Sequence, residues 1–135
     1  MRRALLVLAV GCLLGAACDE TPTEPSNVTG DTWRLVSMQR GSGSPVTVPD
    51  PNRYTLRFGD QGRLEVKSDC NSCGGSYTLT GSTLDVGPVF CTKVFCGDTS
   101  LDSAFVAGLQ GAALVTERGG ELVVEGGGLA LRFRK

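Results

Sequence analysis

Four cysteines in two close pairs are the residues of this sequence with the clearest capacity for chemistry. Two residues separate Cys70 from Cys73, four separate Cys91 from Cys96, and 17 residues lie between the pairs. Such a pattern can hold a structural zinc ion, form a redox-active pair or make structural disulfides. The chain contains no histidine, which excludes histidine-ligated metal sites, Ser-His-Asp triads and Cys-His dyads.

The redox interpretation is the weakest of the three, because a CxxC thiolate of low pKa needs the N-terminus of a helix. Cys73 leads instead into Gly74, Gly75 and a predicted strand. Zinc ribbons resemble the pattern, but their second pair usually has two intervening residues rather than four. The choice between zinc and disulfides then depends on whether the protein is exported, since disulfides persist in oxidising compartments.

The first 17 residues have the organisation of a bacterial export signal. Arg2 and Arg3 form a positive start, and an apolar run covers residues 4–14. That run is too short to cross a membrane, which takes about 20 apolar residues. Small residues at 15–17 followed by Cys18 resemble a lipobox, in which the cysteine is lipidated and begins the mature protein. Gly15 departs from that pattern, because a leucine is usual there.

We therefore predict a signal peptide over residues 1–17, a lipidated Cys18 with a flexible tether over 18–30, and a folded domain over 31–135. The tether sequence DETPTEPSNVTG contains two prolines, three acidic residues and too little apolar surface to fold. Acyl chains on Cys18 would hold the protein on a membrane of the bacterial cell envelope, facing the periplasm or the cell exterior. This location favours structural disulfides for the four domain cysteines. Bridges within either pair would close very small rings, so we expect bridges between the pairs.

The remaining sequence alternates between apolar and polar residues, as antiparallel strands with one wet face do. Tyr54, Leu56 and Phe58 share one face of 53–58, and Leu64 and Val66 share one face of 63–67, with a turn between them. Further strands are predicted over 32–38, 77–79, 84–86, 113–117, 121–125 and 129–135, and residues 41–51 are predicted to be a loop. A content of 19 glycines fits turn-rich β structure.

Residues 100–110 have helical spacing, because Leu101, Phe105 and Leu109 recur every four positions. Thr99 and Asp102 have the form of a capping box, and Gly111 stands where a C-terminal cap belongs. We predict one helix whose apolar face lies in the core.

Six motifs in order, from about Thr32 to Arg134, resemble the META domain family, also called HslJ-like. They are Trp33-Arg34-Leu35; Tyr54-Thr55-Leu56-Arg57-Phe58 with Gly59 and Gly62; Cys70-Asn71 with Gly75-Ser76-Tyr77-Thr78-Leu79; Cys91 to Cys96; Phe105 with Leu109; and Gly128 to Phe133. Asp69 departs from the family pattern, which has a glycine there, and Lys93-Val94 replaces Arg-Met.

The resemblance implies a mainly β (α+β) fold, an antiparallel cracked or open β-barrel of about 7–8 short strands with one α-helix. It also implies a bacterial envelope setting, with links to heat induction, antibiotic tolerance and secretion, and it supplies no catalytic residue or cofactor. Cys70 and Cys96 match cysteines of the family, whereas Cys73 and Cys91 are an extra pair. The expected bridges are therefore Cys70–Cys96 and Cys73–Cys91.

Catalysis needs acid, base or nucleophilic groups that converge, and the acidic residues here fall on predicted turns and exposed faces. Asp69, Asn71, Lys93 and Asp98 are expected near the cysteine loops, in loop hydrogen bonds. Trp33, Tyr54 and Tyr77 are expected in the core rather than stacked on a ligand. The formal net charge of −1 provides no basic field for nucleic acid.

We expect a non-catalytic, monomeric, lipid-anchored envelope protein without metal or cofactor, which acts through contacts with an unidentified envelope protein. The alternative is a module that binds a small hydrophobic ligand or a lipid. A contiguous exposed apolar patch or a sizeable pocket would favour the alternative, and a closed core would favour protein contacts.

Overall fold

The computed structural model describes residues 28–135; the predicted signal peptide, Cys18 and tether residues 19–27 lie outside the described residues. The strands are β1 (Thr32–Arg40), β2 (Val46–Thr47), β3 (Tyr54–Phe58), β4 (Arg63–Ser68), β5 (Asn71–Thr80), β6 (Thr83–Val86), β7 (Phe90–Cys91), β8 (Gly111–Arg118), β9 (Glu121–Gly126) and β10 (Leu129–Arg134). The α-helix α1 (Asp102–Leu109) precedes β8, and short 3-10 helices cover Pro51–Arg53 and Asp60–Gly62. Within residues 28–135, no helix has the length and apolar character to span a membrane.

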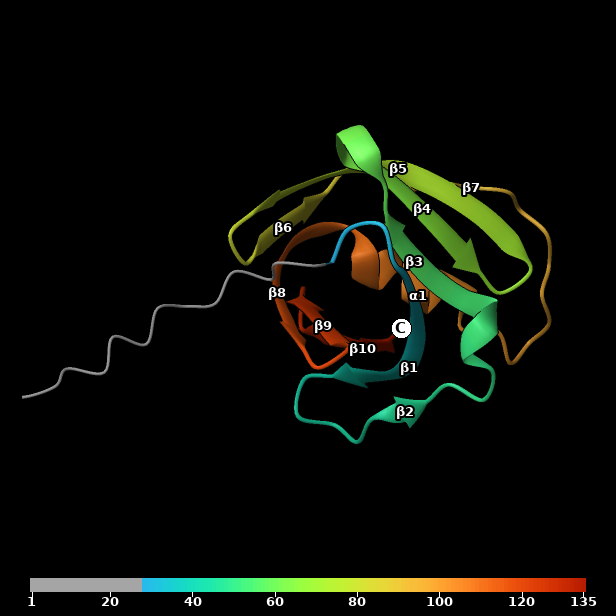
Figure 1. Cartoon of the computed structure of the whole chain (residues 1–135). Coiled ribbons are helices and arrows are strands. Elements are labelled where there is room, and N and C mark those ends of the chain that lie inside the picture. Colours follow the sequence, from blue (N-terminus) through green and yellow to red (C-terminus); the bar gives the residue numbers. More distant parts are fainter. Residues whose placement is uncertain (1–27) are drawn as a thin grey trace, which may run out of the picture.

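Eight of these strands form a closed antiparallel ring (Figure 1). The order around the ring is β1, β3, β4, β5, β6, β8, β9 and β10, and β10 pairs with β1 to close it. A register shift between Leu35 and Ser37 interrupts this last pairing, and such bulges bend a strand and help a sheet to curve. The expectation of a mostly β antiparallel barrel with one helix is confirmed.

The interior of the barrel is filled by side chains. Trp33, Leu56, Phe58 and Phe133 point inward and are fully buried, as is Phe105 of the helix. In Figure 1, α1 lies within the outline of the ring, and it contacts β4, β9 and β10. The helix therefore closes one end of the barrel and completes its core.

The inward face predicted from alternation is correct on both strands of the β3–β4 hairpin. Tyr54, Leu56, Phe58, Leu64 and Val66 are all buried. On the helix, Phe105 and Leu109 are buried, and Leu101 packs against the core from its edge.

The predicted capping box is not formed, and the helix is shorter than expected. Leu101 occupies the N-cap position, and the hydroxyl of Ser100, not of Thr99, accepts the Asp102 N–H at 3.2 Å. The Asp102 N–H therefore still receives a side-chain hydroxyl as its acceptor, but from Ser100 rather than from the predicted Thr99.

Two strands were missed, and β5 is much longer than predicted, whereas β1 and β8 extend two or three residues beyond their predicted bounds. β2 lies inside the predicted loop 41–51, and β7 lies inside the cysteine segment. Two-residue strands have no periodicity to detect, since alternation needs at least four residues. β5 begins at Asn71 rather than at the predicted Tyr77. The prediction missed the first half of this strand because Gly74 and Gly75 give it no side-chain pattern.

The two ends of the barrel differ. One end, which we call the turn end, carries the turns at 59–62, 81–82 and 119–120, residues 28–31 and Lys135. The other end, the helix end, carries α1, the β4–β5 turn and the turn at 126–128. Val28 is buried, and its carbonyl accepts a hydrogen bond from Trp33 Nε1 at 2.8 Å. The last three residues assigned to the tether are thus part of the fold.

Candidate functional site

Two disulfides lie at the helix end, Cys70–Cys96 and Cys73–Cys91, in the expected pairing. Cys73 and Cys91 are direct neighbours across the β5–β7 pair. The bridges fasten residues 90–96, which we call the disulfide segment, to β5 and to the turn before it. Among residues 28–135, no group of three or more His, Cys, Asp or Glu side chains is arranged to hold a metal ion.

Asn71 holds the disulfide segment in place from beneath. It is buried, and its side-chain oxygen accepts the Val94 N–H and the Thr92 hydroxyl, both at 2.8 Å. Its amide nitrogen donates to the Val94 carbonyl at 3.0 Å and to Asp102 of α1 at 3.2 Å. Donor and acceptor are both satisfied, so the asparagine that follows Cys70 has a structural role.

Asp69 is buried, although the acidic residues were expected to be exposed. It is 3% exposed. Its φ of 58° lies in the left-handed region, which glycine adopts most easily, and this agrees with the glycine expected here from the family resemblance. Its carboxylate accepts the Tyr54 hydroxyl at 3.0 Å and pairs with Arg53. Burial by itself raises the pKa of Asp69, but the Ser100 and Tyr54 hydroxyls and the Arg53 charge outweigh it and hold the pKa below the ordinary value.

A groove of about 520 Å³ lies between the disulfide segment and α1. Cys91, Val94 and Phe95 line one side, and Val106 and Ala107 of the helix line the other. Lys93 and Asp102 give it one charge of each sign. This groove combines an apolar surface with a rim that two disulfides fix in place.

The disulfide segment exposes large apolar side chains. Phe90 is 76% exposed, Val94 58% and Phe95 80%. Exposed apolar residues are ordinary when scattered singly, but here three of them lie on one short segment that is fastened by disulfides.

The expected cluster of Asp69, Asn71, Lys93 and Asp98 forms only in part. Asn71 and Lys93 both line the groove, whereas Asp69 lines a separate hollow with Arg53 and Cys96, and Asp98 is exposed. Trp33 and Tyr54 are buried as predicted; Tyr77 is half-buried and donates its hydroxyl to the Gly59 carbonyl at 3.0 Å. The part that Asp102 plays in the groove was missed, because its spacing indicated a helix cap.

This fold and site define a small β-barrel module with a disulfide-fastened loop at one end. The META domain model matches residues 26–135, so the chain belongs to the META domain family. No curated protein matches the chain.

Solved structures share the architecture. An NMR structure of a protein from Burkholderia xenovorans is similar with a TM-score of 0.65 and 21% identity, over 79% of this chain and 82% of that one. A crystal structure of a lipocalin-like protein from Bacteroides uniformis is similar with a TM-score of 0.54 and 20% identity, over 80% of this chain and 97% of that one. At these identities the likeness concerns the fold alone.

Proposed function

We propose that this protein is a non-catalytic module of the bacterial cell envelope, anchored by lipid on Cys18, that binds a partner protein through the disulfide segment. The observation that carries the proposal is the exposure of Phe90, Val94 and Phe95 on a segment tied down at both ends. A surface that is already ordered loses little conformational freedom when it binds. Membership of the META domain family supports a barrel-type envelope module.

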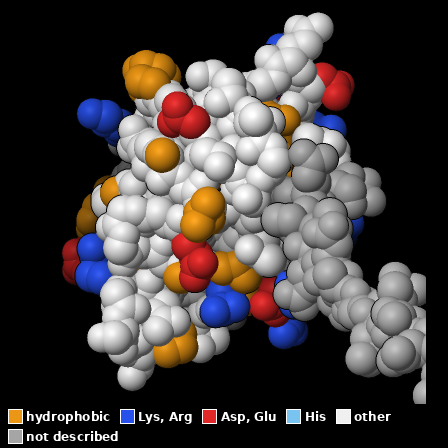
Figure 2. Space-filling view, turned by 90° about the vertical axis from the view of Figure 1, so that its left-hand side faces the viewer, with side chains coloured by type: hydrophobic (Ala, Val, Ile, Leu, Met, Phe, Trp, Pro, Cys, Tyr) orange, Lys and Arg blue, Asp and Glu red, His pale blue; other side chains and the backbone are white. Residues whose placement is uncertain are grey.

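One other face of the domain supports the same assignment. Figure 2 shows a face on which hydrophobic side chains form small separate groups among acidic and basic ones. Such mixing is typical of a surface in contact with water. The concentration of large exposed apolar side chains at residues 90–96 therefore distinguishes the disulfide segment.

A second candidate function is the binding of a small hydrophobic ligand, which the barrel likeness to a lipocalin-like protein suggests. The inward side chains fill the barrel, so such a ligand would bind outside it, in the groove between the disulfide segment and α1. A volume of about 520 Å³ falls in the range of small-molecule sites. Either occupant would contact Val94 and Phe95.

The double variant Phe90→Ser/Phe95→Ser is expected to abolish a specific cross-link to a partner in intact cells, because it removes the exposed aromatic surface. Leu114→Ser is the control, since Leu114 is an exposed apolar side chain on β8, paired with β6 and β9 and not with the disulfide segment. Cross-linking followed by mass spectrometry measures the result. Equal loss in the two variants would contradict the proposed surface. A small molecule that co-purifies with the wild-type chain and not with Phe90→Ser/Phe95→Ser would favour the second function.

Cys18→Ser is expected to move the protein from the membrane to the soluble fraction after a high-salt wash, because it removes the acceptor for the acyl chains. Cys12→Ser is the matched control, since it changes a cysteine within the apolar run and keeps Cys18. Fractionation and immunoblotting measure the distribution. Retention of the Cys18→Ser chain in salt-washed membranes would show that the lipobox interpretation is wrong.

A further inference from the structure

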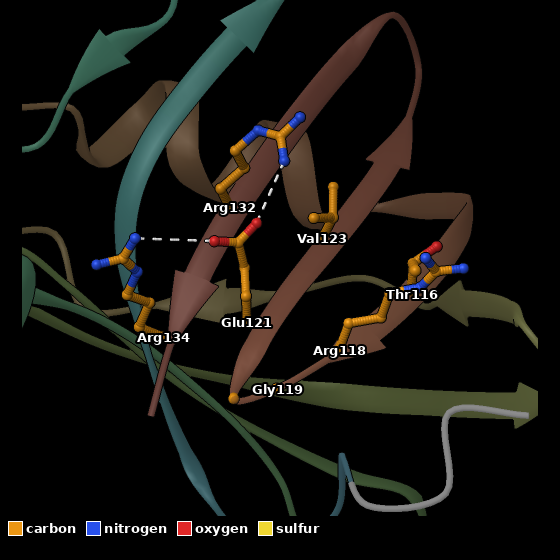
Figure 3. Close-up of a pocket in the computed structure, with 8 residues that line it drawn as sticks. Thr116, Arg118, Gly119, Glu121, Val123, Arg132 and Arg134 are labelled. Carbon is orange, nitrogen blue, oxygen red and sulfur yellow. Dashed lines mark hydrogen bonds and ion pairs between the residues drawn. The ribbon is translucent and has the colours of Figure 1, made fainter. Parts of the chain in front are cut away.

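A second groove, of about 720 Å³, lies on the outer face of β8, β9 and β10 at the turn end. Arg118, Arg132 and Arg134 line it together with Glu121 (Figure 3). Glu121 is opposite Arg118 across the β8–β9 pair and opposite Arg134 across the β9–β10 pair. We call this groove, with Arg118, Glu121, Arg132 and Arg134 as its charged lining, the arginine groove.

The arginine groove has an excess of positive charge. The Glu121 carboxylate lies 3.5 Å from Arg132 Nη1 and 3.9 Å from Arg134 Nη2, and in Figure 3 it reaches away from Arg118. One carboxylate leaves two of the three guanidinium charges uncompensated. Residues 28–135 contain 11 basic and 11 acidic side chains, so this excess is local and the rest of the described domain is negative. Arg134 is 69% exposed, which leaves it accessible to a ligand.

The arginine groove lies beside the point at which the chain leaves the barrel towards Cys18. Lys135 N–H donates to the Gly120 carbonyl in the turn at 3.3 Å, and Lys135 Nζ pairs with Asp31 at 2.7 Å. Asp31 follows Val28, the first described residue, by three positions. The ten steps of chain from Cys18 to Val28 can span at most about 35 Å. A lipid on Cys18 would therefore keep Val28, and the turn end beside it, within about 35 Å of the bilayer.

We infer that the arginine groove binds the phosphate groups of anionic phospholipids in the bilayer that carries Cys18; this inference rests on the proposed anchoring. Guanidinium groups form paired hydrogen bonds with phosphate oxygens, and each basic side chain near an anionic surface strengthens binding about fivefold. The attraction falls off within about 8–10 Å at physiological salt, so it needs the tether to bring the surfaces together. Docking by the turn end directs the disulfide segment, at the opposite end, away from the membrane.

The test uses the exported full chain with Cys18→Ser, so that no acyl chain contributes, and vesicles of phosphatidylglycerol with phosphatidylethanolamine. Binding is expected to these vesicles, to weaken with salt, and to be absent with phosphatidylcholine alone. Arg118→Glu/Arg134→Glu is expected to weaken it about tenfold or more, and Arg118→Ala/Arg134→Ala by less. Arg40→Glu/Lys67→Glu makes the same charge change at exposed residues of the helix end and is expected to leave binding within about twofold. Vesicle sedimentation measures the affinity, and melting temperatures check that each variant folds.

Equal losses in the two Glu variants, or equal binding to neutral vesicles, would overturn the inference. Inorganic phosphate that binds the chain when anionic vesicles do not would indicate a site for free phosphate and would also overturn it. The anchor is tested separately by cell fractionation. A Cys18→Ser chain that is released from membranes but does not bind anionic vesicles would support the lipid anchor and overturn the docking surface. A Cys18→Ser chain that stays in salt-washed membranes but binds anionic vesicles through the arginine groove would support the docking surface and contradict the lipid anchor.

Discussion

Phe105→Ala is expected to lower the free energy of unfolding by about 3–5 kcal/mol. Phe105 is fully buried, and its ring packs edge-on against Tyr54 and tilted against Phe133, with centroids 5.8 and 6.1 Å apart. Alanine would leave a cavity between the helix and the barrel wall. The loss is large against a total of about 5–15 kcal/mol for a small domain, so denaturant unfolding at equilibrium will measure it.

Val106→Ala is the matched control for this substitution. Val106 is the next residue of α1, but it is only half-buried and faces the groove rather than the core. A change of less than about 1 kcal/mol is expected for it, because little buried surface is lost and alanine favours the helix. A change of that size for Phe105→Ala would show that the helix does not close the barrel.

The effect of Phe105 should extend to the helix end, because its neighbour Tyr54 joins three elements. The Tyr54 hydroxyl donates to Asp69 and accepts the Leu101 N–H, both at 3.0 Å. Asp69 immediately precedes Cys70 of the first disulfide. The core of the barrel thus supports the surface that presents the disulfide segment.

Local spacing was sufficient to predict the hairpins and the helix, since a period of two or about four residues reports directly which face is buried. Tyr54, Leu56 and Phe58 show this for β3, and Phe105 and Leu109 show it for α1. Closure of the ring is different in kind, because β1 and β10 pair from opposite ends of the domain. No local pattern records a pairing between segments so far apart in the sequence.

In the candidate sites, too, some residues could be predicted from local sequence and others could not. Cys70 with Asn71 could be identified from sequence, because motif and spacing lie within a few residues. The arginine groove could not, since Arg118, Glu121 and Arg134 each fit the polar face of their own strand. Only the register of β8, β9 and β10 brings their side chains together.

None of Cys70, Cys73, Cys91 and Cys96 is expected to react with an alkylating agent in the denatured, unreduced protein, because all four are bridged. Reduction should lower the melting temperature by many degrees. The sequence separations of 26 and 18 residues correspond to about 3 kcal/mol per bridge in the chain-entropy model. Each kcal/mol lost lowers the melting temperature of a domain of this size by about 4 °C.

Paired variants separate the two bridges and provide the control. Cys70→Ser/Cys96→Ser and Cys73→Ser/Cys91→Ser should each cost about 2–4 kcal/mol, because each opens one loop and leaves no odd thiol. A chelator should leave the melting temperature unchanged, and peptide mapping should join Cys70 to Cys96 and Cys73 to Cys91. Four reactive thiols with stoichiometric zinc would establish a zinc site instead. A Cys70–Cys73 bridge that mild thiols reduce would restore the redox interpretation, and with it a catalytic role for this end of the barrel.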